Sequence, residues 1–237
     1  MTIIAKPYTF AYQPIVNTKT RCIESFEALV RGPQGQGAAW VMSPLGVEAL
    51  RQFDIDARLR AIALAGELQL SVRLNLNLLA DSVDAAGGSA LTSTIDMAAI
   101  AGLRAEQLVL EVSERDAITN VRAFVARANM CKALGVRFAI DDFGAGFSGL
   151  NLLAEFQPEQ LKLDILLVQD VHRKGPRQAI TRGVLRTCED LGIEVVAEGV
   201  ETLDEYRWLS DEGIHLFQGY LFARPAFERL PHVEFPD

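Results

Sequence analysis

Short apolar runs rich in β-forming residues alternate with longer helix-like segments from Tyr8 to Phe222 of this chain of 237 residues. Such alternation is typical of strands joined by helical crossovers, and it constrains the fold more than any other feature. The strand candidates number eight, the count of a (β/α)8 barrel, which usually takes about 250 residues. They lie at 8–16, 21–30, 72–76, 107–112, 136–140, 160–163, 193–197 and 213–217.

The first two strand candidates are joined by only a short segment, Asn17 to Thr20. This segment is too short for a helical crossover, so we expect an antiparallel hairpin there. The predicted fold is therefore an α/β, TIM-like (β/α)8 barrel whose first strand is antiparallel to the rest. No linker or charge block interrupts the alternation, which favours one domain over residues 1–237. We also expect a helix over Val47 to Leu68 and a flexible surface loop over the Gly/Ala/Ser-rich stretch Asp84 to Ser93.

Charge and cysteine content argue against several classes of protein. The formal charge of −8 and the pI near 5.0 disfavour a DNA or RNA duplex as partner, because backbone binding needs a surplus of Lys and Arg. The three cysteines form no C-x-x-C pair, which fits a reducing cytoplasm. No apolar run has the length of a signal peptide core or a membrane span, so we expect a cytoplasmic protein without a membrane partner.

Polar and acidic residues recur where the strand candidates end. Each alone would more often be a loop cap or a surface charge. In a barrel, however, the carboxyl ends of parallel strands meet at one face, so we expect these side chains to converge. Five of them are carboxylates, which repel one another unless cations lie between them. The set is Glu27, Asn75, Glu111, Asp141, Asp142, Lys162, Glu198 and Gln218.

The ligand types in this set favour hard ions. Oxygen ligands without His or Cys suit Mg²⁺ or Mn²⁺ better than zinc, and the three histidines of the chain lack ligand spacing. Asp141 and Asp142 are adjacent, which in a strand sends side chains to opposite sides, so a sharp turn is needed to bring both to a metal. Gly144 and Gly146 follow and permit an unusual backbone there.

Four motifs together resemble the EAL domain of cyclic di-GMP phosphodiesterases. They stand in the family's order, and the similarity runs from Tyr12 to Pro225. Singly, a Glu-Ala-Leu tripeptide is a weak signal, but the four together are highly specific. They are Glu27-Ala28-Leu29-Val30-Arg31, Asp141-Asp142-Phe143-Gly144, Glu198-Gly199-Val200-Glu201 and Gln218-Gly219-Tyr220.

The resemblance implies a two-metal hydrolase that opens cyclic di-GMP to linear pGpG, with two Mg²⁺ or Mn²⁺ ions as cofactors. The metal-ligand positions are Glu27, Asn75, Glu111, Asp141, Asp142 and Glu198. Lys162 corresponds to the lysine near the attacking water, and Glu198 to the general base or metal partner; with Glu27 they are the expected catalytic residues. The resemblance implies that Glu114 anchors the glycine loop after Asp142. Substrate-contacting positions are Gln13, Arg31, Asp164, Glu201 and Gln218, although Gln13 and Arg31 could equally serve structure alone.

Several positions depart from the family pattern. Ala145, Phe147 and Gly149 stand where Thr, Tyr and Ser are more usual. Asn77 stands where Ser is common, and Ile165 where Arg is frequent. None is a ligand position. Two lost hydroxyls would weaken loop hydrogen bonds by roughly 1 kcal/mol each, which lowers a rate without abolishing it.

Two alternatives stay open. A catalytically weak or inactive EAL domain would act as a cyclic di-GMP receptor or a protein-binding regulator, and such members usually lack ligand residues that are all present here. An unrelated barrel enzyme could use Mg²⁺ to stabilise an enolate, but the motif order argues against it. By analogy with the family we expect a homodimer formed near Phe143 to Gly149. The stretch Val30 to Gly37 with Trp40 resembles EAL domains joined to light sensors, so a regulatory sensor on another chain is a candidate partner.

Overall fold

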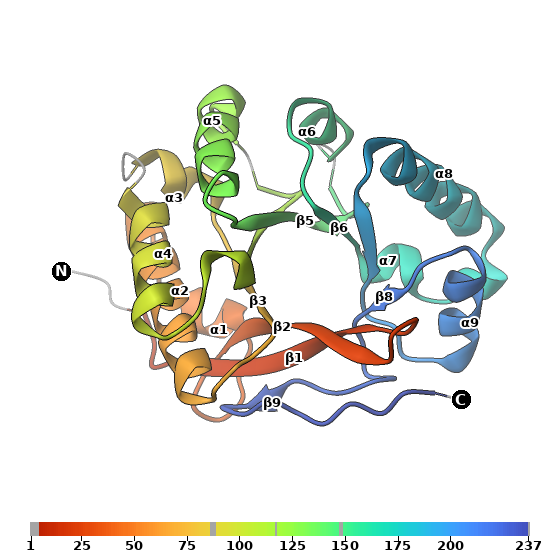
Figure 1. The fold of residues 1–237 in the computed structure, drawn as a ribbon, viewed down its shortest axis with the longest axis horizontal. Helices are drawn as coiled ribbons and strands as arrows, with labels where there is room; N and C mark the ends of the chain where they lie inside the picture. Colours follow the sequence, from red (N-terminus) through yellow and green to blue (C-terminus); the bar gives the residue numbers. More distant parts are fainter. Residues whose placement is uncertain (1–4, 86–88, 117, 147–148, 237) are drawn as a thin grey trace.

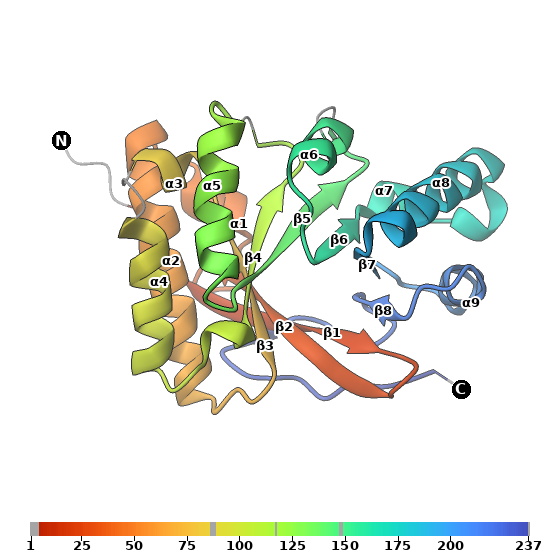
Figure 2. The ribbon, with the colours of Figure 1, turned by 45° about the horizontal axis from the view of Figure 1, so that its top comes forward.

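The computed structural model describes residues 5–85, 89–116, 118–146 and 149–236. Its centre is a closed barrel of strands with helices outside it (Figures 1 and 2). The barrel strands are β1 (Thr9–Asn17), β2 (Cys22–Arg31), β3 (Arg73–Asn77), β4 (Leu108–Ser113), β5 (Arg137–Phe143), β6 (Gln160–Leu163), β7 (Glu194–Ala197) and β8 (Leu216–Phe217).

Strand pairing confirms the predicted barrel. The hydrogen-bonded order is β2-β3-β4-β5-β6-β7-β8-β1, and pairing of β1 with β2 closes the ring. Strands β2 to β8 run parallel to their neighbours, whereas β1 is antiparallel to both β2 and β8. The carboxyl ends of β2 to β8 therefore meet at one mouth, where the sequence places its acidic residues.

Helices cover the outside of the barrel. In Figure 1, α2, α4 and α5 stand on one side, with α8 and α9 on the opposite side. No helix in the described ranges is long and apolar enough to span a membrane. The helices are α1 (Ala38–Met42), α2 (Val47–Glu67), α3 (Ala80–Ala85), α4 (Ser89–Ile100), α5 (Val121–Lys132), α6 (Gly149–Glu155), α7 (Ile165–Val168), α8 (Gly175–Leu191) and α9 (Leu203–Asp211), with 3-10 turns at Ala105–Gln107 and Val171–Arg173.

Two local predictions were wrong. Ser89 to Ser93, expected within a loop over Asp84 to Ser93, instead begin α4, while residues 86–88 lie outside the described part. Ala90 and Leu91 are buried there, so tertiary packing decides the conformation of a stretch whose composition suggests a loop. The last predicted strand shortens to β8, and a ninth strand, β9 (Ala226–Phe227), pairs with β1 and was not predicted.

The interior of the barrel changes character toward its mouth. Leu74, Leu108 and Phe138 are fully buried in an apolar core. At the mouth, Asn75 and Lys162 are equally buried. Burying polar and charged groups lowers stability unless each group has a partner. The buried polar residues at the mouth therefore need partners that an apolar core would not require.

Candidate active site

Lys162 lies at the centre of the polar cluster in the mouth of the barrel. β6 positions it, and its side chain is 0% exposed. Its Nζ lies 2.6 Å from Glu198 Oε1, 2.8 Å from Glu111 Oε1, 3.0 Å from Asp141 Oδ1 and 3.3 Å from Glu27 Oε2. One ammonium thus faces four carboxylates, which leaves an excess of negative charge in a buried place.

Side-chain amides hold two of these carboxylates. Asn75 Nδ2 donates to Glu111 Oε1 at 2.8 Å, and Gln218 Nε2 donates to Glu27 Oε2 at 2.7 Å. Strand register brings further polar residues to Glu27, which lies opposite Asn75 in the β2–β3 pair and opposite Gln13 in the β1–β2 pair. Gln13 Oε1 in turn lies 3.4 Å from Gln218 Nε2. Residues from both ends of the sequence therefore meet at one carboxylate.

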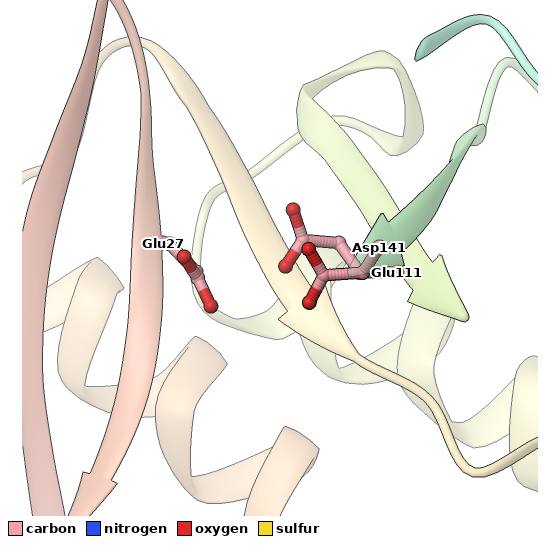
Figure 3. Close-up of side chains that lie close together, drawn as sticks. All are labelled: Glu27, Glu111 and Asp141. Carbon is pink, nitrogen blue, oxygen red and sulfur yellow. The ribbon is translucent and has the colours of Figure 1, made fainter. Parts of the chain in front are cut away.

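Two groups of carboxylates have the geometry of metal ligands. Figure 3 shows the first, in which Glu27, Glu111 and Asp141 project from β2, β4 and β5 toward a common space. Asp141 belongs also to the second group, with Asp142 and Glu198; within each group the ligand atoms lie within 4.8 Å of one another.

Buried oxygens test whether a cation fits the first group. Asn75 Oδ1 and Glu111 Oε2 are buried and have no hydrogen-bond partner among the described residues. Buried oxygens rarely stay unpaired, and oxygen-only donor sets suit hard divalent cations. The residues present therefore fit such an ion. Lys162 cannot replace it, because these two oxygens remain without a partner in the described part of the chain although Lys162 is present.

Asp141 and Asp142 reach the same site although they are neighbours in β5. Asp142 has a left-handed backbone with φ +56°, and the β5–β6 register is irregular between Ile140 and Phe143. A bulge of this kind redirects side chains that would otherwise alternate across the sheet. The sharp turn expected from the sequence is thus present, within the strand instead of after it.

The crowding of charges shifts the pKa values of the cluster. Burial raises the pKa of Glu111 to about 8 despite the opposing effect of Lys162. Burial, and then repulsion from Asp141, raises the pKa of Glu198 well above its ordinary value. For Lys162, burial lowers the pKa, but the surrounding carboxylates outweigh it and hold the pKa well above the ordinary value. Lys162 therefore stays charged, while Glu111 and Glu198 have a raised affinity for protons.

Glu114 holds the segment that follows Asp142. Its Oε2 accepts hydrogen bonds from the amides of Gly144 at 2.7 Å and Gly146 at 3.0 Å, and its Oε1 accepts one from Gly149 at 2.8 Å. A Cβ atom at position 149 would lie 2.5 Å from Glu114 Oε1. Glycine at position 149 therefore leaves room for the Glu114 carboxylate that holds the loop. The sequence comparison had suggested only that a serine hydroxyl was lost at this position.

Two other departures from the family pattern, Asn77 and Ile165, lie at the same mouth. Asn77 Nδ2 donates to Glu27 Oε1 at 3.4 Å, so this amide lies at the site. Ile165 packs against Gly199, which has φ +65°, and a Cβ there would come within 2.6 Å of the isoleucine. Ala145 lies in the described part of the loop, whereas Phe147 lies outside the described residues.

Two cavities open from the mouth and share Glu27. The larger, about 450 Å³, reaches from β2 to α2 between Phe10, Phe53 and Leu76, and Arg31 contributes to its wall. The smaller, about 300 Å³, is lined mostly by polar residues, among them Glu198 and the four predicted substrate-contacting positions other than Arg31. These are Gln13, Asp164, Glu198, Glu201 and Gln218.

Several charged residues near the site escaped sequence reasoning. Arg115 and Asp116 follow the end of β4. Their position after a strand was the one feature of the sequence that could have marked them as site residues. Asp54 and Arg58 form an ion pair on α2 in the wall of the larger cavity, and Asp116 lies in the same wall. The four-residue spacing of Asp54 and Arg58 is typical of an ion pair on the exposed face of a helix. The sequence does not show that Arg58 is buried.

Comparison with protein families and with known proteins gives one consistent family. The EAL domain family matches residues 2–225. The blue light- and temperature-regulated antirepressor BluF of Escherichia coli is 34% identical over 229 residues, covering 96% of this chain and 57% of BluF. The cyclic di-GMP phosphodiesterase NbdA of Pseudomonas aeruginosa is 32% identical, covering 90% of this chain and 28% of NbdA. The chain thus spans little more than half, or less, of these relatives.

Solved structures agree with the sequence matches. The manganese and cyclic di-GMP complex of Klebsiella pneumoniae BlrP1 at pH 9.0 has a TM-score of 0.88 and 44% identity, covering 94% of this chain and 57% of that one. A standalone EAL protein from Vibrio cholerae with bound c-di-GMP has a TM-score of 0.89 and 38% identity, covering 97% of this chain and 96% of that one. By sequence and by fold, the chain belongs to the EAL domain family.

Proposed function

We propose that this protein hydrolyses cyclic di-GMP to linear pGpG with the help of two divalent cations, Mg²⁺ or Mn²⁺. The observation that carries the proposal is the buried cluster of four carboxylates around Lys162, with orphaned oxygens of Asn75 and Glu111 beside it. Relatives named as cyclic di-GMP phosphodiesterases and a similar structure with manganese and cyclic di-GMP support the choice of substrate and cofactor.

In this proposal the two groups of ligands divide between two ions. Bound cations would lower the pKa of a water molecule and neutralise charge on the phosphate during attack. The second ion would take Asp142 and Glu198, with Asp141 shared between the two positions. The first would take Glu27, Asn75, Glu111 and Asp141.

The remaining steps fall to side chains of the protein. Lys162 stays charged and holds the carboxylates in register, and an ammonium beside the attacking water favours its deprotonated form. Glu198, as a carboxylate at the second cation position, accepts the proton of that water. The water oxygen then bonds to phosphorus and the bond from phosphorus to the ribose 3′ oxygen breaks. That oxygen takes up a proton from solvent, and Glu198 releases the proton it accepted to solvent, so one water molecule is consumed overall.

The two cavities suit a ligand with two bases joined at phosphates. The larger, largely apolar cavity has room for one base, and Arg31 in its wall would offer a positive charge to a phosphate. In the smaller cavity, Gln13, Asp164, Glu201 and Gln218 offer polar groups to the second half of the ligand. Glu27 lies in both, at the point where a scissile phosphate would sit.

Hydrolysis of cyclic di-GMP by purified protein tests the proposal. Wild type, Glu27→Gln and the control Glu189→Gln are incubated with Mn²⁺ or Mg²⁺, and pGpG is quantified by chromatography. Glu189 is a suitable control because it is 71% exposed on α8 and pairs only with a neighbouring arginine, among the described residues. We expect Glu27→Gln to lose at least 100-fold in rate and the control to match wild type. Tight binding without turnover in wild type would instead support a receptor or regulator, and neither binding nor turnover would refute the assignment.

We also propose a cytoplasmic protein that forms homodimers and answers to a sensor, in cis or on another chain. Apolar side chains exposed on α6 and α7, Leu150 and Leu166, favour association of copies near the loop after Asp142. BluF, a light-regulated relative, motivates the sensor. Sedimentation that shows a fully active monomer would remove the dimer from this proposal.

A further inference from the structure

Arg115 supplies the positive charge next to Asp142. It follows the end of β4, and its Nε lies 3.9 Å from Asp142 Oδ2 while its Nη2 lies 3.7 Å from Asp164 Oδ2. Within the second carboxylate group, Asp141 and Glu198 contact Lys162, but Asp142 does not. In the described part of the chain, Arg115 is therefore the cation paired with the one ligand that Lys162 leaves uncompensated.

Lys162 and Arg115 differ in their freedom to move. Lys162 is 0% exposed and could not leave without stranding buried carboxylates, whereas the Arg115 side chain is 56% exposed. Arg115 can swing into solvent, because Asp164 keeps a hydrogen bond from the Leu166 amide at 2.7 Å and Asp142 keeps Ser113 Oγ at 3.4 Å. The Asp142 side chain is 36% exposed, and a partly exposed ion pair of this kind breaks at small cost, whereas Asp164 is only 6% exposed and relies on its Leu166 amide hydrogen bond when Arg115 leaves.

We infer that Arg115 is a displaceable counter-charge at the second cation position, competing with the divalent ion for Asp142 and setting its affinity below that of the first position. The inference rests on the two-ion site of the proposed function and adds a residue that tunes it. A cation arriving between Asp141, Asp142 and Glu198 meets repulsion from the guanidinium until the side chain turns away. The first position lies around Glu27 and Glu111, for which no contact with Arg115 is described, so its affinity should not depend on this arginine.

Mn²⁺ binding measures the competition directly. Free Mn²⁺ is followed by electron paramagnetic resonance, with calorimetry as a second readout, at pH 8 in low salt and without substrate. We expect Arg115→Gln to tighten the weaker of two Mn²⁺ dissociation constants by about 3- to 10-fold, or about 0.7–1.4 kcal/mol, and to leave the stronger unchanged. Arg115→Lys, which keeps the charge, should stay near wild type.

The matched control is Arg104→Gln, which removes the same charge elsewhere. Arg104 is 76% exposed and precedes β4, at the end of the strand away from the mouth. We expect it to change neither constant by more than about 2-fold, since Arg104 lies at the far end of β4 from the mouth and its exposed charge acts through water of high dielectric constant. Thermal unfolding followed by circular dichroism checks that each variant is folded.

The outcomes separate this inference from the proposed function. The role of Arg115 would be overturned, and the two-ion site kept, if wild type binds two Mn²⁺ ions but Arg115→Gln binds the weaker ion no more tightly than Arg104→Gln does. A wild type that binds fewer than two Mn²⁺ ions would overturn the two-ion site and the inference together.

Discussion

The Glu114→Gln substitution tests the claim that one carboxylate fastens the loop beside the site. Glu114 is buried and accepts hydrogen bonds from the amides of Gly144, Gly146 and Gly149. Both oxygens are used, one by two amides and the other by the third. Glutamine keeps the shape but replaces one oxygen by an NH₂ group, so at least one amide must face a donor in place of an acceptor.

The magnitude follows from this geometry. If the glutamine oxygen faces Gly144 and Gly146, only the bond to Gly149 is lost; the opposite orientation loses two. A hydrogen bond to a charged group contributes about 1.5–3 kcal/mol, and an unsatisfied buried donor costs about 1–3 kcal/mol. We therefore expect a loss of about 2–3 kcal/mol in the free energy of unfolding, with a lower rate of hydrolysis because the loop adjoins Asp142.

Urea denaturation of wild type, Glu114→Gln and the surface control Glu189→Gln measures the loss. If the free energy of unfolding of each variant has the same slope against urea concentration, the shift in urea midpoint reports the change in stability. A loss below about 0.5 kcal/mol for Glu114→Gln would refute the reasoning, since the three amides would then be equally well satisfied without the carboxylate.

Three further predictions address the same cluster. Without divalent cations, the free energy of unfolding should fall as pH rises from about 5 to 8, because the folded-state pKa of Glu111, about 8, lies above its ordinary value and the folded protein binds the extra proton. Thermal unfolding in chelator measures this dependence, and a flat profile against pH would contradict it. Excess Mg²⁺ should restore the stability lost at high pH. Lys162→Met should lower the free energy of unfolding at pH 8 in chelator by about 3–5 kcal/mol, as expected when one partner of a buried ion cluster is removed, and urea midpoints near wild type would contradict this. Gly149→Ser, which introduces the residue more usual in the family, should lower stability by about 1–3 kcal/mol because its Cβ meets Glu114 Oε1 at 2.5 Å; a rise in the urea midpoint would show that the loop accommodates it.

Sequence reasoning reached most of the barrel because its signals are local. Hydrophobic alternation marks strands without reference to the rest of the chain, and the short link after Asn17 requires the hairpin of β1 and β2. It failed where packing overrides composition. Ser89 to Ser93 look like a loop, yet they begin a helix in which Ala90 and Leu91 are buried.

The candidate site shows the same division. The sequence by itself determined which residues end the strands, and thus that Glu27, Asn75 and Glu111 would gather at one face, because strand ends meet in a closed barrel. Only the tertiary structure decided that Lys162 contacts four carboxylates and that Arg115 lies beside Asp142. Those contacts depend on register, on the bulge at Asp142 and on side-chain direction, which arise from pairings between residues far apart in the chain.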